Sequence, residues 1–279
     1  MIEYWRYELT PKRRLNAVAN AGPRRGALIR ANGGVADIHP WQELGDPPLD
    51  EQLARLARGE TTSLTKASLA FASIDAAARR DGRNLFDGMT IPPSHWPGPD
   101  PPAAFDTVKL KSIDVIPDLV RLRIDFNATL TPSEFIQIAA TLPRERIDFI
   151  EDPCPFDPDV WRDLRSKTGL RLALDRAPDS HSVNSYDVLI LKPAIQELVR
   201  SDAEIVVTSY MDHPIGQLCA AHAAATGNIT STCGLITHVL FENDPFIERM
   251  EIDGTRLVPS EGSGFGFDDL LENLPWRTL

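Results

Sequence analysis

This sequence lacks several features that would place it in particular protein classes. It has only three cysteines in 279 residues, and their spacing matches neither a disulfide framework nor a zinc motif. We therefore expect Cys154, Cys219 and Cys233 to be reduced thiols of a cytosolic protein. No run of about 20 apolar residues is present, which argues against a transmembrane helix. The N-terminal MIEYWRYELTPKRR lacks the apolar core of a signal peptide, which favours a cytoplasmic location.

Positive charge is also scarce. Lys and Arg total 29 against 40 Asp and Glu, which gives a net charge of -11. Nucleic-acid-binding domains usually carry a basic face, so this balance argues against a nucleic-acid partner. Apolar residues make up 42% and charged residues 25%, which is ordinary globular usage and excludes a disordered or fibrous chain. The length suits one large domain, or a large domain with a small one.

The first 88 residues predict a small α+β unit. Three short strands are expected, at residues 3–9, 26–31 and 35–40. Asn32-Gly33 supplies the positive φ angles of a tight hairpin turn between the second and third of them. Two amphipathic helices should follow, at residues 49–58 and 65–80. Residues 91–102 then hold six prolines, which excludes a regular helix or a central strand. We interpret this stretch as a stiff surface linker at the domain boundary.

Beyond the linker, short apolar runs alternate with helical patterns. The runs lie at residues 107–111, 119–126, 147–152, 170–175, 187–192, 204–209 and 234–241, and the helical stretches at 132–142, 159–168 and 215–226. This alternation predicts a parallel sheet. Seven such strands, with one more in the proline-rich region, suggest a barrel of the (β/α)8 type. An open doubly wound sheet is the alternative, but GSGFGF (262–267) is followed by no crossover helix and second strand, so it is not a nucleotide loop.

Short connections predict that the barrel lacks some of its outer helices. Only seven residues, SIDVIPD, separate Lys111 from Leu119, whereas a parallel crossover normally takes about 10–12 or more. Pro117 favours an extended path for this connection. We therefore predict two parallel strands with no helix between them, and a second missing helix at the proline-rich stretch. Loops, with Trp96 or Phe105, would cover that flank.

Polar side chains mark the ends of five successive strands. In strand order these residues are Lys109 and Lys111, Asp125, Glu151, Asp175 and Lys192. The carboxyl ends of parallel barrel strands meet at one rim, where the active sites of such barrels lie. A single acid at a strand end is more often a helix cap or a solvated loop residue. We interpret Asp152 and Asp157 in that way, but five strands in a row favour a functional set.

Three carboxylates on three successive strands form a hard, oxygen-only donor set. Such a set suits Mg²⁺ or Mn²⁺ and not zinc, because no His or Cys accompanies it. The flanking lysines could remove an α-proton from a carboxylate substrate while the metal stabilises the enolate. Residues two apart on a strand share a face, so Lys109 points with Lys111, and Arg123 and Asn127 point with Asp125.

The same residues carry a resemblance to a known group of enzymes. The matching pieces are Lys109-Leu-Lys111, Arg123-Ile-Asp125-Phe-Asn127, Ile150-Glu151-Asp152-Pro153, Leu174-Asp175 and Leu191-Lys192-Pro193. Residues 26–46 and 262–268 resemble that group's capping domain and closing segment. The chain thus resembles the muconate-lactonizing subgroup of the enolase superfamily over about residues 2–272, and most closely its o-succinylbenzoate synthase family.

This resemblance implies a fold and a reaction. The fold is a modified (β/α)8-type barrel with shortened or missing outer helices, over residues 89–249. A small α+β capping domain, residues 1–88, would carry the tail 250–279 packed back on it. The reaction is the metal-assisted syn dehydration of 2-succinyl-6-hydroxy-2,4-cyclohexadiene-1-carboxylate to o-succinylbenzoate in menaquinone biosynthesis. The implied partner is this small-molecule carboxylate, with no nucleic acid or membrane, for a monomer or weak homodimer.

The resemblance also assigns roles by position. Lys111 would be the base and then the acid that assists hydroxide loss, and Lys192 a cation that stabilises the enediolate. Lys109 would help hold the substrate carboxylate and favour the neutral form of Lys111. The implied ligands of Mg²⁺, or of Mn²⁺, are Asp125, Glu151 and Asp175. The implied substrate contacts are Arg123, Asn127, Thr208, Ser209 and Gly234.

Two positions depart from the family pattern: Arg176 stands where an acid is usual, and Asp212 where a Glu is expected. Alternatives remain open. An N-succinylamino acid racemase, or another epimerase or cycloisomerase of the subgroup, could use the same two lysines. Epimerases usually carry paired acids after the last strand, where this chain has CGLIT (233–237). A Schiff-base aldolase using Lys192 would leave three carboxylates surplus. A binding protein on a decayed barrel is opposed by the presence of all three acids and all three lysines.

Overall fold

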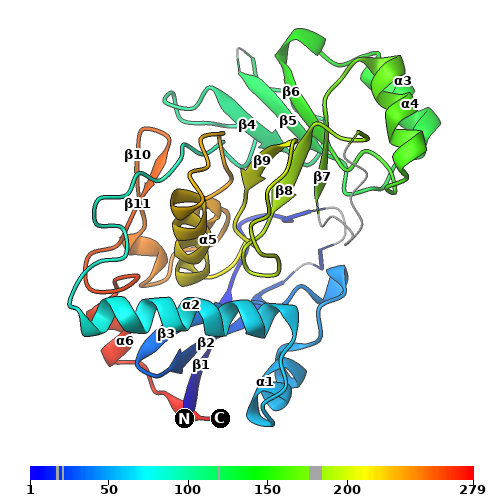
Figure 1. The fold of residues 1–279 in the computed structure, drawn as a ribbon. Coiled ribbons are helices and arrows are strands. Elements are labelled where there is room, and N and C mark those ends of the chain that lie inside the picture. Colours follow the sequence, from blue (N-terminus) through cyan, green and yellow to red (C-terminus); the bar gives the residue numbers. More distant parts are fainter. Residues whose placement is uncertain (17–18, 21, 119, 176–183) are drawn as a thin grey trace.

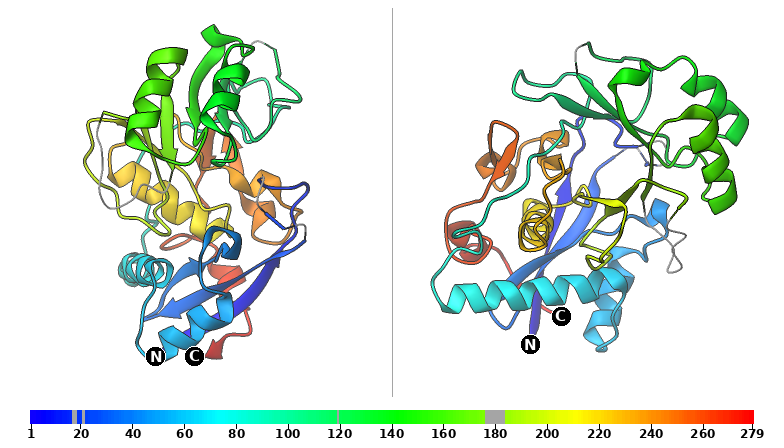
Figure 2. Two further views of the ribbon diagram at one scale, coloured as in Figure 1. Left: turned by 90° about the vertical axis from the view of Figure 1, so that its right-hand side faces the viewer. Right: turned by 45° about the horizontal axis from the view of Figure 1, so that its top comes forward.

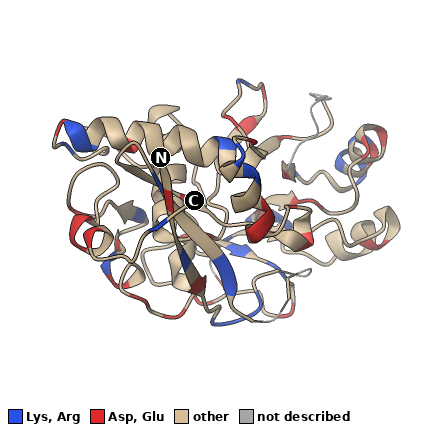
Figure 3. Cartoon of the chain, turned by 90° about the horizontal axis from the view of Figure 1, so that it is seen from below, with Lys and Arg blue, Asp and Glu red and all other residues tan. Residues whose placement is uncertain are grey.

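The computed structural model describes residues 1–16, 19–20, 22–118, 120–175 and 184–279. The chain forms two lobes, an antiparallel sheet with helices below and a curled parallel sheet above (Figures 1 and 2). None of the described helices is long and apolar enough to cross a membrane. Acidic and basic residues are interspersed over the elements when the chain is seen from below (Figure 3). All three cysteines are free, as the sequence predicted, and all three are buried.

The lower lobe is built on a four-stranded sheet with the order β12-β1-β2-β3. Its strands are β1 (Ile2–Leu9), β2 (Arg24–Ala31), β3 (Gly34–Ile38) and β12 (Arg277–Thr278). Asn32 and Gly33 turn the β2–β3 hairpin with φ angles of 53° and 87°, which confirms the predicted turn. Because β12 pairs with β1, the end of the tail lies on this lobe. The division of the chain at residue 88 stays a prediction.

Two helices accompany this sheet, as predicted. They are α1 (Leu49–Ala57) and α2 (Ser63–Arg80), preceded by the 3-10 turn η1 (Gln42–Leu44). Thr62 begins α2 with a capping box, in which its hydroxyl accepts from Thr65 N–H and the Thr65 hydroxyl accepts from Thr62 N–H. Helix α2 lies directly on β3 at Gly34, where a Cβ would come 1.9 Å from the Ala72 carbonyl oxygen. A residue without a side chain is therefore required for this close approach.

The upper lobe is a parallel sheet of six strands in chain order. They are β4 (Thr107–Leu110), β5 (Arg121–Asp125), β6 (Ile147–Glu151), β7 (Leu172–Asp175), β8 (Val188–Leu191) and β9 (Glu204–Val207). Three single parallel bridges close the ring: Thr208 with Gly234, Cys233 with Ser94, and Trp96 with Val108. Six strands and two bridging segments thus form a ring of eight members, which confirms the modified (β/α)8-type barrel.

The proline-rich stretch contributes one of those bridging segments. Ser94 and His95 are buried, His95 N–H donates to the Cys233 carbonyl at 2.9 Å, and Trp96 N–H donates to Thr107 at 2.9 Å. The surface-linker interpretation is therefore wrong for residues 94–96. Proline removes only its own N–H, and the three residues between Pro93 and Pro97 keep the donors that a ladder needs.

The outer layer of helices is incomplete, as predicted. Its described helices are α3 (Pro132–Ala139), α4 (Pro158–Thr168) and α5 (Pro214–Thr226); α3 and α4 lie together beside β6 and β7 (Figure 1). The described residues between β4 and β5, 111–118 and 120, contain no helix, and the two strands are parallel. Trp96 packs against Phe105 on this flank with ring centroids 5.2 Å apart. The structure confirms the missing helix.

The expected strand at residues 234–241 is wrong beyond Gly234. Residues Thr237–Leu240 form the 3-10 turn η3, and both the backbone N–H and Nδ1 of His238 lie 3.0 Å from the side-chain oxygen of Gln217 on α5. This pairing with a helix replaces pairing with a neighbouring strand. The chain continues through the turn η4 (Ile247–Arg249), the hairpin β10 (Glu251–Asp253) and β11 (Arg256–Val258), and α6 (Asp268–Glu272).

One apolar cluster joins the two lobes. It contains Tyr7, Leu28 and Trp41 from the lower lobe together with Ile215 and Phe241 from the upper lobe. Trp41 Nε1 donates to the Tyr210 carbonyl at 2.7 Å, so a side chain of the lower lobe is tied to the loop after β9. The lower lobe is therefore held against the rim of the barrel.

Candidate active site

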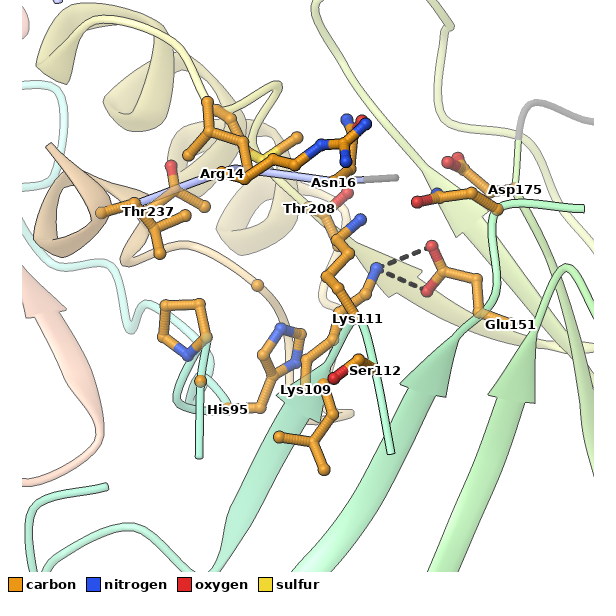
Figure 4. Close-up of a pocket in the computed structure, with 18 of the residues that line it drawn as sticks. Arg14, Asn16, His95, Lys109, Lys111, Ser112, Glu151, Asp175, Thr208 and Thr237 are labelled. Carbon is orange, nitrogen blue, oxygen red and sulfur yellow. Dashed lines mark hydrogen bonds and ion pairs between the residues drawn. The ribbon is translucent and has the colours of Figure 1, made fainter. Parts of the chain in front are cut away.

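A cavity of about 700 Å³ opens at the rim of the barrel, against the lower lobe. Lys109, Lys111, Glu151, Asp175 and Lys192 line it from the strand ends. Figure 4 shows these strands with Arg14 and Asn16 entering from the top of the view and His95 from the bottom. The structure thus brings together the strand-end residues that the sequence singled out.

Ammonium and carboxylate groups alternate along this rim. Lys109 Nζ lies 2.6 and 2.7 Å from the two Glu151 oxygens and 3.2 Å from Asp125 Oδ2. Lys111 Nζ lies 2.6 Å from the same Asp125 oxygen, and Lys192 Nζ bonds Asp175 Oδ2. Each of the three carboxylates is therefore paired with at least one lysine.

Asp125 lies beneath the cavity surface, with its side chain only 1% exposed. Burial opposes its ionisation, but Lys111 and Lys109 outweigh that effect and hold its pKa well below the usual range. Asn127 supports the other oxygen, because its backbone N–H and its side-chain amide donate to Asp125 Oδ1 at 2.9 and 3.0 Å. Asn127 also lines the cavity. The Asp125 carboxylate is thus held ionised and in a fixed orientation.

Glu151 and Lys109 respond to burial in different ways. Burial and the neighbouring carboxylates of Asp125 and Asp175 raise the pKa of Glu151 to about 7, against the attraction of Lys109. Burial disfavours the Lys109 ammonium, but the three carboxylates prevail and raise its pKa above the usual range. Lys109 therefore remains a cation bound to the acids.

The donor set fits a hard divalent cation. Asp175 Oδ1 is buried and has no hydrogen-bond partner among the described residues, so one carboxylate oxygen in the site remains available to a ligand. All candidate donors are carboxylate oxygens, as Mg²⁺ prefers. In the part of the chain that the structure describes, the acids do not form a ready-made cluster of ligands, since lysines hold their other oxygens.

Asp152 belongs to this site, whereas the sequence suggested a helix cap or a loop residue. Its φ is 41°, and its Oδ1 accepts the Asp175 backbone N–H at 3.1 Å. Burial and the neighbouring acids Asp175, Glu151 and Asp125 raise its pKa well above the usual range. The other acid interpreted as a cap, Asp157, does begin α4 by accepting from the N–H groups of Asp159 and Val160.

Arg123 lies inside the barrel, below the cavity lining. Its guanidinium donates to Asp148 at 2.8 Å and to the Thr232 carbonyl at 2.7 Å, and it stacks over the Phe149 ring at 4.6 Å. Its Nη1 lies 3.1 Å from His95 Nδ1, and His95 does line the cavity. A direct contact of Arg123 with substrate stays a prediction, since the described geometry connects it to the cavity through His95.

Thr208, Ser209 and Gly234 form the wall next to His95. All three line the cavity, and the Ser209 and Thr237 hydroxyls lie 2.7 Å apart. A Cβ on Gly234 would come 2.9 Å from Thr208 Cγ2 and 2.9 Å from His95 Cε1. Gly234 thus leaves room for both side chains next to its backbone.

Two residues, Asp212 and Arg176, depart from the family pattern. Asp212 is buried at the junction of the lobes, where burial and Asp37 raise its pKa well above the usual range. Asp37 in turn accepts from the Tyr7 hydroxyl at 2.6 Å. Asp212 therefore belongs to an interlobe cluster. Arg176 lies outside the described residues.

Sequence reasoning missed two contributions to the cavity. His95 was hidden in the proline-rich stretch, and its signal was a short non-proline segment between prolines. Arg14 and Asn16 come from the loop after β1. The only signal for that loop was a polar stretch, PKRRLN, directly after a strand.

Comparisons with known proteins found a family model and a curated relative that match this chain. Residues 2–78 match the family model described as O-succinylbenzoate synthase, N-terminal domain. The chain is 32% identical to a curated o-succinylbenzoate synthase of Bdellovibrio bacteriovorus, over 100% of this chain and 98% of that relative.

Solved structures show the same fold at low identity. A muconate lactonizing enzyme from Mycobacterium smegmatis, complexed with muconolactone, aligns with a TM-score of 0.75 and 17% identity over 99% of both chains. A dipeptide epimerase from Cytophaga hutchinsonii, complexed with Mg and the dipeptide D-Ala-L-Val, aligns with a TM-score of 0.74 and 16% identity over 99% of this chain and 98% of that one. At these identities the likeness shows the fold alone.

Proposed function

The chain belongs to the o-succinylbenzoate synthase family, and from this premise we propose that it dehydrates 2-succinyl-6-hydroxy-2,4-cyclohexadiene-1-carboxylate to o-succinylbenzoate in menaquinone biosynthesis. It is then a carbon–oxygen lyase. The observation that supports this best is the rim of the cavity, where Lys109, Lys111 and Lys192 flank three carboxylates from three successive strands. This combination suits the removal of a proton next to a carboxylate, because an amine can take the proton while nearby positive charge stabilises the anion.

Two lysines supply the proton chemistry of this proposal. Neutral Lys111 takes the proton from the ring carbon that bears the carboxylate, and the ammonium then gives that proton to the departing hydroxyl group, so that water leaves and the amine is restored. Lys192 remains a cation and stabilises the negative charge that develops on the substrate carboxylate. Lys109, held charged by Glu151 and Asp125, helps to bind that carboxylate.

A divalent cation belongs to the proposal, with Asp125, Glu151 and Asp175 as its ligands. We propose Mg²⁺, with Mn²⁺ as the alternative, because the three acids offer carboxylate oxygens as ligands. The cation, when bound, supplies positive charge that lowers the energy of the deprotonated substrate. With the acids holding a cation, the lysines that pair with them would have amines to offer to the substrate. Asn127 keeps Asp125 in place throughout.

The remaining contacts complete the proposal. Thr208, Ser209 and Gly234 line the succinyl end of a small carboxylate substrate, and Arg123 and Asn127 are its further contacts. We propose a cytoplasmic enzyme, a monomer or weak homodimer, with no nucleic-acid or membrane partner.

The test is an assay of the purified protein with the synthetic cyclohexadiene substrate. We expect o-succinylbenzoate to form, to stop with EDTA, and to resume when Mg²⁺ is added. Failure to form product with Mg²⁺ present would contradict the proposed function. An N-succinylamino acid in deuterium oxide tests the racemase alternative by exchange of its α-proton. Borohydride with substrate tests the aldolase alternative, which the ion pair of Lys192 with Asp175 disfavours.

A further inference from the structure

His95 lines the cavity, and the proposed reaction assigns it no role. It lies on the bridging segment 94–96 and is only 4% exposed. Its backbone N–H donates to Cys233, and the edge of its ring rests against Gly234, where a Cβ would come 2.9 Å from Cε1 and 3.1 Å from Nε2. The ring is therefore held in one orientation.

Arg123 determines which ring nitrogen of His95 carries the proton. Its Nη1 lies 3.1 Å from His95 Nδ1, and a guanidinium has only donors, so Nδ1 must accept. The guanidinium cannot turn away easily, since Asp148 and the Thr232 carbonyl bind it as well. Burial, with the positive charges of Arg123, Lys109 and Lys111, holds the pKa of His95 well below its usual range, so the imidazole is neutral. The proton then resides on Nε2, as a donor.

The hydroxyl of Thr208 is a second polar group in this wall of the cavity. Thr208 Oγ1 is buried and has no hydrogen-bond partner within the described residues, although Thr208 lines the same cavity. Likewise, none of the described residues hydrogen-bonds to His95 Nε2, whose partner lies only on the Nδ1 side. Leaving a buried polar group without a partner is unfavourable, so a ligand that supplies acceptors to these groups is favoured.

We propose that His95 Nε2–H is the principal donor of a subsite for the oxygens of the substrate's succinyl arm, with the Thr208 hydroxyl as a second donor in the same wall and Arg123 as the positioning residue that fixes the His95 donor. The choice of substrate rests on the proposed function, whereas the donor geometry does not. A neutral donor pair suits a carbonyl or carboxylate oxygen, and it rejects an ammonium group, which has no lone pair to offer. This subsite would therefore help to discriminate succinyl substrates from aminoacyl ones.

Binding of two ligands tests the subsite without requiring turnover. The ligands are o-succinylbenzoate, which has the arm, and benzoate, which lacks it, each measured by calorimetry with Mg²⁺ present. His95→Phe and Thr208→Val should each weaken o-succinylbenzoate binding about tenfold and leave benzoate binding unchanged. His95→Gln, which can place an amide donor near the Nε2 position, should recover most of the affinity. Equal loss for both ligands, or no loss for either, overturns the subsite.

The tautomer is tested in the intact protein by long-range ¹H–¹⁵N spectroscopy of the histidine rings. We expect His95 to be neutral with its proton on Nε2 between pH 6 and 8. Arg123→Lys should keep this tautomer, and Arg123→Met should change it. A proton on Nδ1 or an imidazolium in the wild-type protein overturns the assignment, even where variants fold poorly. If the wild-type enzyme forms no o-succinylbenzoate, the proposed function fails. If it turns over normally while His95→Phe and Thr208→Val bind the arm as well as wild type, only the subsite fails.

Discussion

The ion pair of Arg24 with Glu43 offers a sharp test of how the lower lobe shapes the cavity. Arg24 donates to both Glu43 oxygens, at 2.6 and 3.0 Å, and lies over the Trp41 ring at 4.0 Å. Trp41 in turn bonds the Tyr210 carbonyl on the barrel side, and both aromatic residues line the cavity. Glu43→Gln should remove the charge and keep the shape.

The magnitude follows from the carboxylate's pKa. The hydrogen bonds from Arg24, opposed by partial burial, lower the pKa of Glu43 from 4.5 to about 2. At 1.36 kcal/mol per pKa unit, this corresponds to roughly 2–3 kcal/mol of stability at neutral pH once the partial exposure of the pair is allowed for. Because the folded-state pKa is depressed, this stability is present above about pH 4.5 and is lost as the pH falls towards about 2. The cost of Glu43→Gln should therefore be about 1 kcal/mol smaller at pH 3.5 than at pH 7.

Urea unfolding, followed by circular dichroism and tryptophan fluorescence at both pH values, measures this difference. The matched control is Glu8→Gln. Glu8 on β1 pairs with Arg25, which follows Arg24 on β2, but the side chains of Glu8 and Arg25 are 51% and 77% exposed. That control should change the free energy of unfolding by less than about 0.5 kcal/mol. A cost for Glu43→Gln that is equal at the two pH values, or no larger than the control's, would refute the reasoning.

Four further outcomes are expected. Lys111→Ala should abolish o-succinylbenzoate formation while calorimetry shows near-normal Mg²⁺ affinity, and more than a few per cent of residual turnover would move the base role elsewhere. Asp125→Asn should weaken Mg²⁺ binding and reduce turnover by about two orders of magnitude or more; unchanged affinity would remove Asp125 from the ligand set. Gly34→Ala should cost more than about 2 kcal/mol in urea unfolding, because the new Cβ would meet the Ala72 carbonyl at 1.9 Å. The three buried cysteines should react with a thiol reagent only after unfolding; rapid reaction of the native protein would contradict their burial.

The rim of the cavity could be predicted from the sequence because it depends on the local geometry of single strands. A strand fixes the side of the sheet to which residues two apart point, and parallel strands share one end. Lys109 and Lys111, and the three acids, could therefore be placed together before any contact was known. The same reasoning placed the missing helix between β4 and β5, since chain length alone limits the connection.

What the sequence could not supply depends on long-range pairing. His95 acquires its place because the ring of strands must close at Cys233 and Val108. The strand count placed one more strand in the proline-rich region, but it did not indicate that His95 would face the cavity. Asp152 turns into the site through a backbone φ of 41°, which the sequence does not indicate for a residue before proline. The ion pairs of Lys109 with Glu151 and Asp125 also depend on side-chain positions that the sequence does not give. Its expected effect on Lys111 stays a prediction.

Neighbouring strands of the barrel are joined by unequal numbers of hydrogen bonds, and this affects where the barrel opens locally. Five junctions between strands are continuous ladders, whereas the seam from Thr208 through Gly234, Cys233 and Ser94 to Trp96 is held by single bridges. Local opening requires the loss of fewer hydrogen bonds there, so amide hydrogens along the seam should exchange with solvent sooner than those of β5 to β8. The succinyl subsite sits on that seam. A ligand that contacts both His95 and Thr208 would bridge this seam. We therefore expect amide exchange along the seam to be slower when the ligand is bound.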